Sequence, residues 1–528
     1  HPSFQRDGIE LGIELEVLYR PYLSLEELSP LHPLIEIELA ELNRLDIPKF
    51  MANADSESIE LTDGTLVRSC FKGSPLDTAS RKVRAFCEAD LLWQTELIRS
   101  SMAVRATIEI REEFGRSDEQ QPSVEGPLLD RGQILDIAEG IADKIRNRAI
   151  MSDKGEPSWV TISPSEDEKQ FYLDDMKLDL YQGNIGVGVF FAAMEKLNPG
   201  KGYGDFVYST ISMSRRWIAR ARPLDIEIMG IGGVSGLGSV IYGLTSISSI
   251  LDDQPLLEDA IQAAKLITEK AINDDTVLDI LAGTAGMLSA LLALFRATGD
   301  RSILGKALQC GHHLVGKRQD IGDGLIAWKP TDDSPALTGF SHGTAGIAYA
   351  LLSLYRETQE LVFYQAAEEA IAFEDTQYNA KVGNWADNRV DPTNPDENRE
   401  NAFMWGWCNG APGIALARIG TLDVFDNKTV RAQIETSVNA TASQPHLRSD
   451  HLCCGNASLG EVLLSAGEKY QHPSWKRAAL KTTSTTISRH TSEGGFTPHS
   501  VFNELFNPSL FQGSSGFGYH LLRLLEPA

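Results

Sequence analysis

The stretch Gly283-Thr-Ala-Gly-Met-Leu-Ser-Ala-Leu-Leu-Ala-Leu-Phe295 places two glycines three residues apart, directly ahead of a run of small and apolar residues. A helix that is apolar almost all round is typical of the buried layer of a large protein, and its small residues let neighbouring helices approach closely. The apolar run from Leu281 to Phe295 is shorter than the ~18 residues that a membrane-spanning helix needs. We therefore predict a buried helix and no membrane span.

The same pattern occurs seven times, at spacings of 45 to 67 residues. This spacing leaves room for two helices per copy and is typical of helical-hairpin repeats. We predict an all-α fold in which about seven hairpins close into an (α/α) toroid, with apolar inner helices and amphipathic outer ones; an open solenoid is the alternative. The first glycines of the copies are Gly183, Gly233, Gly283, Gly343, Gly410, Gly455 and Gly513.

Composition narrows the class of protein. The chain has 528 residues, 42% hydrophobic and 23% charged, with a formal net charge of −25. These proportions are ordinary for a globular protein. The negative charge argues against a nucleic-acid or anionic-membrane surface and suits a basic peptide partner. Cys70, Cys87 and Cys310 are scattered singly, which argues against a disulfide framework and favours the cytoplasm.

The other three of the six cysteines lie in two short segments, residues 407–413 and 451–456. Three thiols without a fourth protein ligand fit a catalytic zinc site better than a structural one, because structural sites use four protein ligands and catalytic sites leave one position open. The alternative is buried, unreactive cysteine, since cysteine is among the most buried residue types.

Candidate polar residues share a place in the repeat. Asp179 stands four residues before its glycine, His342 one, Cys408 two and Cys454 one. All four are therefore expected at the N-terminal ends of inner helices, which meet at one mouth if these helices run the same way. The positive end of a helix stabilises a thiolate. The alternative for Asp179 is a simple helix cap, and for His342 a hydrogen-bonded polar residue at a helix start.

Four motifs resemble those of lanthionine cyclases, and most closely the C-terminal cyclase domain of class II lanthipeptide synthetases. They are Asp-Leu-Tyr-Gln-Gly at 179–183, Gly-Phe-Ser-His-Gly at 339–343, Trp-Cys-Asn-Gly-Ala-Pro-Gly at 407–413 and His-Leu-Cys-Cys-Gly-Asn at 451–456. The resemblance covers roughly residue 130 to the end, in the same order.

The resemblance implies a toroid around Zn²⁺, with Cys408, Cys453 and Cys454 as ligands, as in a subgroup with a three-cysteine site. It implies that His342 and Asp179 are the acid–base residues. The sequence departs from the family at two places: some members have Arg where this chain has Met404, and Asn409 replaces an aromatic residue or His.

The reaction implied is the addition of Cys thiols to dehydroalanine or dehydrobutyrine in a ribosomal precursor peptide made of a leader and a dehydrated core. Residues 1–115 resemble the C-terminal remnant of the preceding dehydratase domain and are expected to be short and mostly helical. Residues 116–129 are expected to be a linker, and residues 130–528 the cyclase. Two alternatives stay open: a non-catalytic peptide-binding toroid with a structural metal, and a glycosidase-type toroid, which needs two carboxylates in its cavity.

Overall fold

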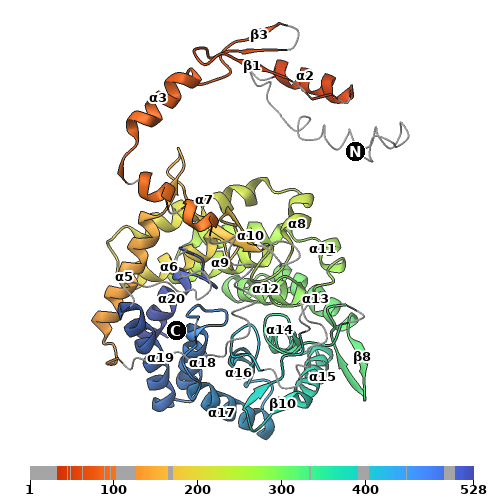
Figure 1. Cartoon of the computed structure of the whole chain (residues 1–528). Coiled ribbons are helices and arrows are strands. Elements are labelled where there is room, and N and C mark those ends of the chain that lie inside the picture. Colours follow the sequence, from red (N-terminus) through yellow and green to blue (C-terminus); the bar gives the residue numbers. More distant parts are fainter. Residues whose placement is uncertain are drawn as a thin grey trace. The chain divides into compact units, whose positions relative to one another are not determined.

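The computed structural model describes residues 32–102, 126–164, 171–389, 403–492 and 506–527, apart from positions 45, 48, 62–63, 89, 96, 332–333 and 448. It forms two compact units, His1–Arg99 and Ser100–Ala528, which Figure 1 colours along the sequence. Most of the expected linker at 116–129 lies outside the described residues, and so does the expected boundary at residue 115.

The first unit contains a small antiparallel sheet between two helices. Helix outweighs strand among its described residues, in keeping with the mostly helical segment that the sequence predicts. The second of its helices begins where the Ser74 hydroxyl accepts a hydrogen bond from the Asp77 amide, with Pro75 in the first turn. Its elements are α2 (His32–Asn43), β1 (Met51–Ala52), β2 (Ile59–Glu60), β3 (Leu66–Val67) and α3 (Pro75–Ala85).

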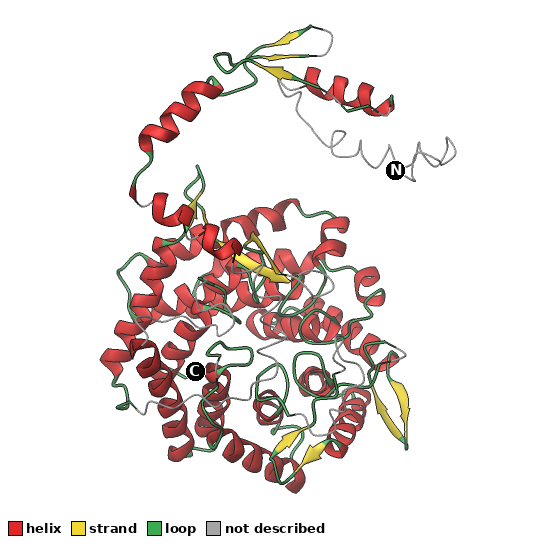
Figure 2. Cartoon of the chain, in the orientation of Figure 1, coloured by secondary structure: helices red, strands yellow, loops and turns green. Residues whose placement is uncertain are grey.

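The second unit is a closed double ring of helices (Figures 1 and 2). Its inner helices are α6 (Asn184–Leu197), α9 (Leu237–Leu251), α12 (Thr284–Thr298), α14 (Thr344–Thr358), α16 (Ala411–Gly420), α18 (Asn456–Lys469) and α20 (Ser514–Leu525). The outer helices are α5 (Arg131–Asn147), α7 (Tyr203–Arg220), α10 (Gln254–Leu266), α13 (Arg301–Gly316), α15 (Leu361–Thr376), α17 (Lys428–Ala442) and α19 (Pro473–Ser492).

Contacts between helices show that the ring is closed. Each inner helix packs against the outer helix that follows it, and the last one, α20, packs against α5 and also against α6. The predicted all-α toroid of seven hairpins is therefore confirmed within the described residues. Among these residues, every helix is too short or too polar to cross a bilayer.

Short elements at the rim complete the toroid. They are the helices α8 (Pro223–Met229) and α11 (Glu269–Asn273) and four two-stranded antiparallel sheets. The sheets pair β4 (Ile150–Met151) with β5 (Pro157–Ser158), β6 (Val160–Pro164) with β7 (Phe171–Asp175), β8 (Gln319–Gly322) with β9 (Leu325–Ala327), and β10 (Tyr378–Asn379) with β11 (Asn384–Trp385).

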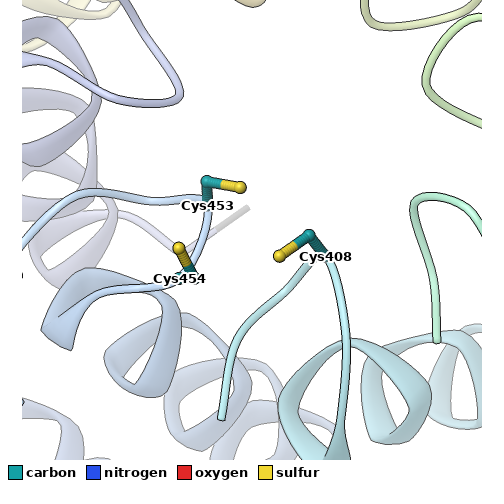
Figure 3. A group of neighbouring side chains, drawn as sticks. All are labelled: Cys408, Cys453 and Cys454. Atoms are coloured by element: carbon teal, nitrogen blue, oxygen red, sulfur yellow. The ribbon is translucent and has the colours of Figure 1, made fainter. Parts of the chain in front are cut away.

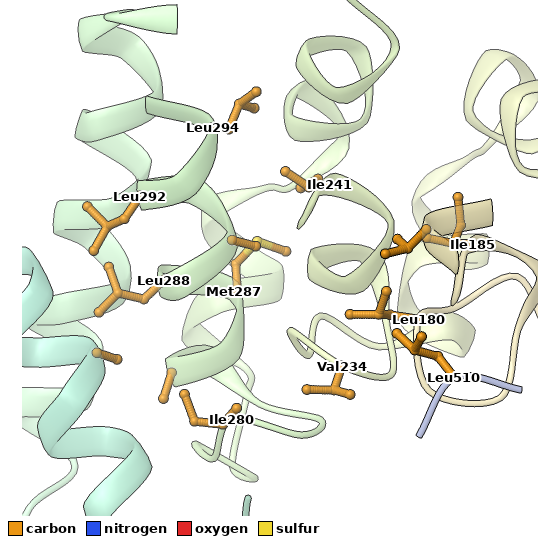
Figure 4. Packing of buried hydrophobic residues seen from close by; sticks show 14 of the residues in the cluster. Leu180, Ile185, Val234, Ile241, Ile280, Met287, Leu288, Leu292, Leu294 and Leu510 are labelled. Carbon is orange, nitrogen blue, oxygen red and sulfur yellow. The ribbon is translucent and has the colours of Figure 1, made fainter. Parts of the chain in front are cut away.

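The core lies mainly between and along the inner helices. Leu288 and Leu292 of α12, Ile241 of α9 and Ile185 of α6 are all buried (Figure 4). Burying a side chain of this size stabilises the fold by about 1.5–3 kcal/mol relative to leaving it exposed. The apolar character of the inner helices thus supplies the packing that sets the ring.

A glycine forms the N-cap of every inner helix, and it is the first glycine of the copy everywhere but in the second copy. There the cap is Gly236 rather than Gly233. Gly236 has φ +130°, which disfavours any side chain. Gly233 is needed for another reason, because a Cβ there would lie 2.6 Å from the Cα of Gly286 in the next repeat.

Candidate functional site

Three cysteine side chains converge at the start of two neighbouring inner helices (Figure 3). Cys408 lies on the loop before α16, and Cys453 and Cys454 lie on the loop before α18. Their sulfur atoms are all within 4.8 Å of one another. Cys453 is buried and the other two are half-buried. The structure thus brings together the three residues that the sequence proposed as metal ligands.

The seven loops that precede the inner helices are joined by backbone hydrogen bonds into a closed circle. We call the residue two positions before the N-cap glycine the key residue of its loop. The amide of each key residue donates to the carbonyl of the key residue in the next loop. The key residues are Tyr181, Val234, Leu281, Ser341, Cys408, Cys453 and Phe511, and the Phe511 amide donates to the Tyr181 carbonyl at 3.2 Å to close the circle.

This circle explains why the thiols meet. Cys408 and Cys453 are equivalent residues of adjacent repeats, and the Cys408 amide donates to the Cys453 carbonyl at 3.3 Å. On the other side, the Ser341 amide donates to the Cys408 carbonyl at 2.9 Å, which places the loop bearing His342 next to the thiols. The sequence predicted that helix N-termini would meet at one mouth, and the backbone circle is the physical reason that they do.

Hydrogen bonding among the thiols makes one of them acidic. The Cys453 and Cys454 thiols donate to Cys408, which lowers the pKa of Cys408 well below its usual value; burial opposes this effect and the positive charge of Arg389 adds to it. The hydrogen bond to Cys408 raises the pKa of Cys453 and Cys454. The cluster therefore favours a single thiolate, at Cys408, and its three soft sulfur donors match the preferences of Zn²⁺.

His342 forms an ion pair with Asp279. Its Nδ1 atom lies 2.7 Å from Asp279 Oδ2. The other oxygen, Oδ1, accepts hydrogen bonds from the amides of Ala282 at 2.7 Å and Gly283 at 3.1 Å, which fix the carboxylate. Burial alone lowers the pKa of His342, but the hydrogen bond and charge of Asp279, with the negative Cys408, outweigh burial and raise it.

Asp179, the other residue that the resemblance assigns to acid–base chemistry, has other partners than His342. Asp179 accepts hydrogen bonds from the Gln182 amide at 2.8 Å and the Ser235 hydroxyl at 3.1 Å, and burial raises its pKa. The carboxylate that pairs with His342 is therefore that of Asp279. A sequence signal was available, because Asp279 precedes Gly283 by four residues just as Asp179 precedes Gly183.

A buried polar network supports the loop that carries Cys453 and Cys454. Asp450 accepts from Asn456 Nδ2 at 2.6 Å, pairs with His490 Nε2 at 2.6 Å and also contacts Arg489. His451 Nδ1 accepts the Cys454 amide at 3.3 Å. Burial lowers the pKa of His451 to about 4, so the ring is neutral at physiological pH.

The sequence reasoning also missed Arg389. It lies in the polar stretch 384–401, of which residues 384–389 are described and residues 390–401 are not. Its Nη2 atom is 2.9 Å from the sulfur of Met404, the residue that stands where some lanthionine cyclases have Arg. The other departure, Asn409, is buried, and its side-chain oxygen has no hydrogen-bond partner among the described residues.

Aromatic side chains line a cavity of about 480 Å³ inside the ring. Phe511 stacks on Tyr181 and lies 4.7 Å from Trp407 between ring centroids, and Trp407 lies 5.5 Å from Phe340. The Tyr181 hydroxyl donates to Cys453 Sγ at 3.2 Å. The rings thus connect the thiol cluster to the interior cavity, whose walls are mainly apolar.

The fold and site define a class of protein: a closed helical toroid with a three-thiol cluster and a histidine–aspartate pair at one end. Residues 174–528 match the family described as Lanthionine synthetase C-like protein, and the chain belongs to this family. This match confirms the family that the sequence motifs indicate.

Two relatives illustrate the similarity. The lacticin 481/lactococcin biosynthesis protein LcnDR2 of Lactococcus lactis subsp. lactis is 23% identical over 408 residues, covering 75% of the chain but only 39% of that protein. The chain thus matches about two fifths of the length of this relative. The structure of nisin cyclase is similar with a TM-score of 0.50 and 16% identity, covering 75% of the chain and 94% of nisin cyclase. At 16% sequence identity, this structural similarity shows that the two proteins share the toroidal fold.

Proposed function

We propose that the chain is a zinc-dependent lanthionine cyclase. It adds Cys thiols of a ribosomal precursor peptide, made of a leader and a dehydrated core, to dehydroalanine or dehydrobutyrine, which forms lanthionine or methyllanthionine rings. The observation that carries this proposal is the meeting of three thiols within 4.8 Å of one another beside the loop of the His342–Asp279 pair. Family membership and the two named relatives support the same chemistry.

Cys408, Cys453 and Cys454 are the proposed zinc ligands. Among the described residues the cluster consists of these three alone, which leaves the fourth position of a tetrahedral site for substrate, as in catalytic zinc sites. When bound, zinc lowers the pKa of a coordinated peptide thiol, which is about 8.5 in free cysteine, so that the thiolate is available near neutral pH.

His342 is the proposed proton donor. Asp279 occupies Nδ1, so the outer nitrogen, Nε2, is the one that exchanges a proton with substrate. The peptide sulfur bonds to Cβ of the dehydro residue, the Cα=Cβ π bond breaks, and His342 protonates Cα. The Asp279 carboxylate stabilises the imidazolium before this transfer. We propose that Asp179, the other predicted acid–base residue, serves the site indirectly by holding its loop against Ser235.

The alternative function is a non-catalytic toroid with a structural metal, and the solvent exposure of the His342 side chain argues against it. The side chain of His342 is 42% exposed, whereas its partner Asp279 is 7% exposed. A histidine charged by a buried carboxylate and open to solvent is suited to proton exchange, and a purely structural metal site has no use for it.

We further propose that residues 1–115 are the C-terminal part of a dehydratase domain, and that the parent protein is a bifunctional dehydratase and cyclase of the cytoplasm. The resemblance of residues 45–50 and 93–103 to such a domain supports this, as does the greater length of the relative from Lactococcus lactis. All six cysteines are free, in keeping with a reducing compartment. ATP-dependent removal of water from a precursor peptide by the present chain alone would contradict the assignment of residues 1–115.

The experiment that tests the function uses a dehydrated peptide with one cysteine and one dehydroalanine. The peptide is mixed with the chain, alkylated with a thiol reagent and weighed by mass spectrometry. We expect the chain to remove the alkylatable thiol without changing the peptide mass, because ring closure is an isomerisation. A thiol that stays alkylatable at the rate of the uncatalysed reaction would contradict the proposal.

A further inference from the structure

Residues 384–389, here named the strap, join the two loops on which the proposed reaction depends. The buried Asn384 side chain donates to the Met404 carbonyl at 2.9 Å and accepts from the Ala411 amide at 2.7 Å, so that it clamps both ends of the Cys408 loop. On the other side, the Thr338 hydroxyl donates to the Ala386 carbonyl at 2.6 Å. The strap is therefore fixed between the loop of His342 and the loop of Cys408.

Arg389 is presented by the end of this strap. Its Nε atom donates to Asp387 Oδ1 at 2.9 Å and its Nη2 atom to Asp387 Oδ2 at 2.6 Å, and Asp387 is itself buried. Nη2 also lies 2.9 Å from Met404 Sδ. This two-point pairing holds the guanidinium plane in one orientation. The Arg389 side chain is 39% exposed, so one edge of the fixed plane is accessible.

The accessible edge carries hydrogen-bond donors. Of the five N–H groups of a guanidinium, those on Nη1 have no acceptor within the part of the chain that the structure describes. The guanidinium lies beside the Cys408 loop, because it contacts Met404 four residues before Cys408, and the strap that carries it also hydrogen-bonds to the loop of His342. Among the described residues, Arg389 is thus an oriented cation with unused donors on Nη1, carried by the strap that joins the loops of His342 and Cys408.

We propose that Arg389 is a further catalytic residue whose Nη1 group binds the carbonyl oxygen of the dehydro residue under attack. This inference rests on the proposed cyclase function. When the sulfur–Cβ bond forms and the Cα=Cβ π bond breaks, the electron pair passes through Cα to this oxygen, which becomes an enolate oxygen. Arg389 stabilises that charge until His342 delivers its proton to Cα. A fixed donor aimed at a developing oxyanion stabilises the transition state more than the ground state.

The test compares Arg389→Gln, Arg389→Lys and Arg389→Ala with the native chain. Substrate is the peptide with one cysteine and one dehydroalanine, and both kcat and KM are measured. Losing one oxyanion donor in a water-excluded site costs about 10²–10³ in kcat. Because Arg389 is partly exposed, we expect a loss of about 10- to 100-fold for Gln, mostly in kcat, with zinc content unchanged. Lys keeps the charge without the two-point pairing and should be intermediate.

Chemical rescue separates catalysis from a structural role. Guanidinium chloride at a non-denaturing concentration should raise the kcat of Arg389→Ala, whereas sodium chloride at the same ionic strength should not. The matched control is Arg356→Gln, because Arg356 also pairs through two nitrogens with an aspartate, Asp423, but at the opposite end of α14 from His342. This control should cyclise at the native rate.

Two results would overturn the role of Arg389: a Gln variant within about twofold of the native kcat, or a slow Gln variant that has lost zinc and is restored neither by Lys nor, in the Ala variant, by guanidinium. The proposed function fails in a different way, since the native chain itself would then leave the peptide thiol free.

Discussion

His342 Nδ1 lies 2.7 Å from Asp279 Oδ2, and the two side chains come from the loops of consecutive repeats. The backbone joins these loops as well, since the amides of Ile280 and Leu281 donate to the Ser341 carbonyl at 3.1 and 3.2 Å. The acid–base pair is therefore held by the same circle of hydrogen bonds that brings the cysteines together, although the residues are 63 positions apart in the chain.

Replacing His342 by Asn should slow cyclisation by about 10²–10⁴-fold, the usual contribution of a placed proton donor, while zinc stays bound. Asp279→Asn should cost about 10- to 100-fold, as for other residues that orient a reactive group. Asp179→Asn should have a smaller effect, because Asp179 contacts Ser235 rather than His342. Single-turnover rates check the order, and a larger loss for Asp179→Asn than for Asp279→Asn would contradict it.

The pH dependence of cyclisation should report the His342–Asp279 pair. The protonated imidazole is the proposed acid, so the rate falls as pH rises through the pKa of His342. Asp279 raises that pKa, which keeps the acid form populated to higher pH. Asp279→Asn removes this effect, so the fall in rate should move to lower pH. An unchanged high-pH limb in the variant would show that His342 is not the acid.

The cysteine cluster should hold one zinc per chain. The Cys408→Ala, Cys454→Ala double variant should lose it, because a single sulfur ligand remains. Cys70→Ala is the matched control, since Cys70 is also half-buried but belongs to the first unit and is not a member of the cluster. Metal analysis of the purified proteins provides the measurement. Full zinc content in the double variant would place the metal elsewhere.

Sequence periodicity predicts the helical hairpins, and the shared place of the candidate polar residues in the repeat favours closing them into a toroid. Buried inner helices follow from apolar runs, and Cys408 and Cys453 meet because they occupy the same position in adjacent repeats. Two other features depend on packing that spacing does not encode. In the second copy Gly236 caps the helix while Gly233 closely approaches Gly286, and Asp279, not Asp179, belongs to the loop adjacent to His342.

The position of Arg389 near the site could not be predicted from the sequence, because it also depends on packing. It lies outside the repeat, on a strap whose position is set by the side chains of Asn384 and Thr338. The polar composition of residues 384–401 is typical of solvated surface. Nothing in the spacing of these residues indicates that the first of them hydrogen-bond to the loops of His342 and Cys408.

The close approach of repeats can be tested at one glycine. A Cβ on Gly286 would overlap the backbone of Ile280 and Gly233, so Gly286→Ala should lower the free energy of unfolding by about 1–3 kcal/mol or more. Gly305→Ala is the control, because Gly305 is exposed in α13 with open space around it. It should raise stability by about 0.5–1 kcal/mol. Denaturant unfolding gives both values, and equal effects would contradict the packing argument.

The most direct test of a metal-dependent cyclase removes the metal and restores it. The chain is stripped with a chelator, zinc is added back in steps, and ring closure of the dehydrated peptide is followed by thiol alkylation and mass spectrometry. We predict no catalysed closure in the stripped protein, and a rate that rises in proportion to bound zinc and levels off at one per chain. Closure at the native rate by the stripped protein would contradict the account.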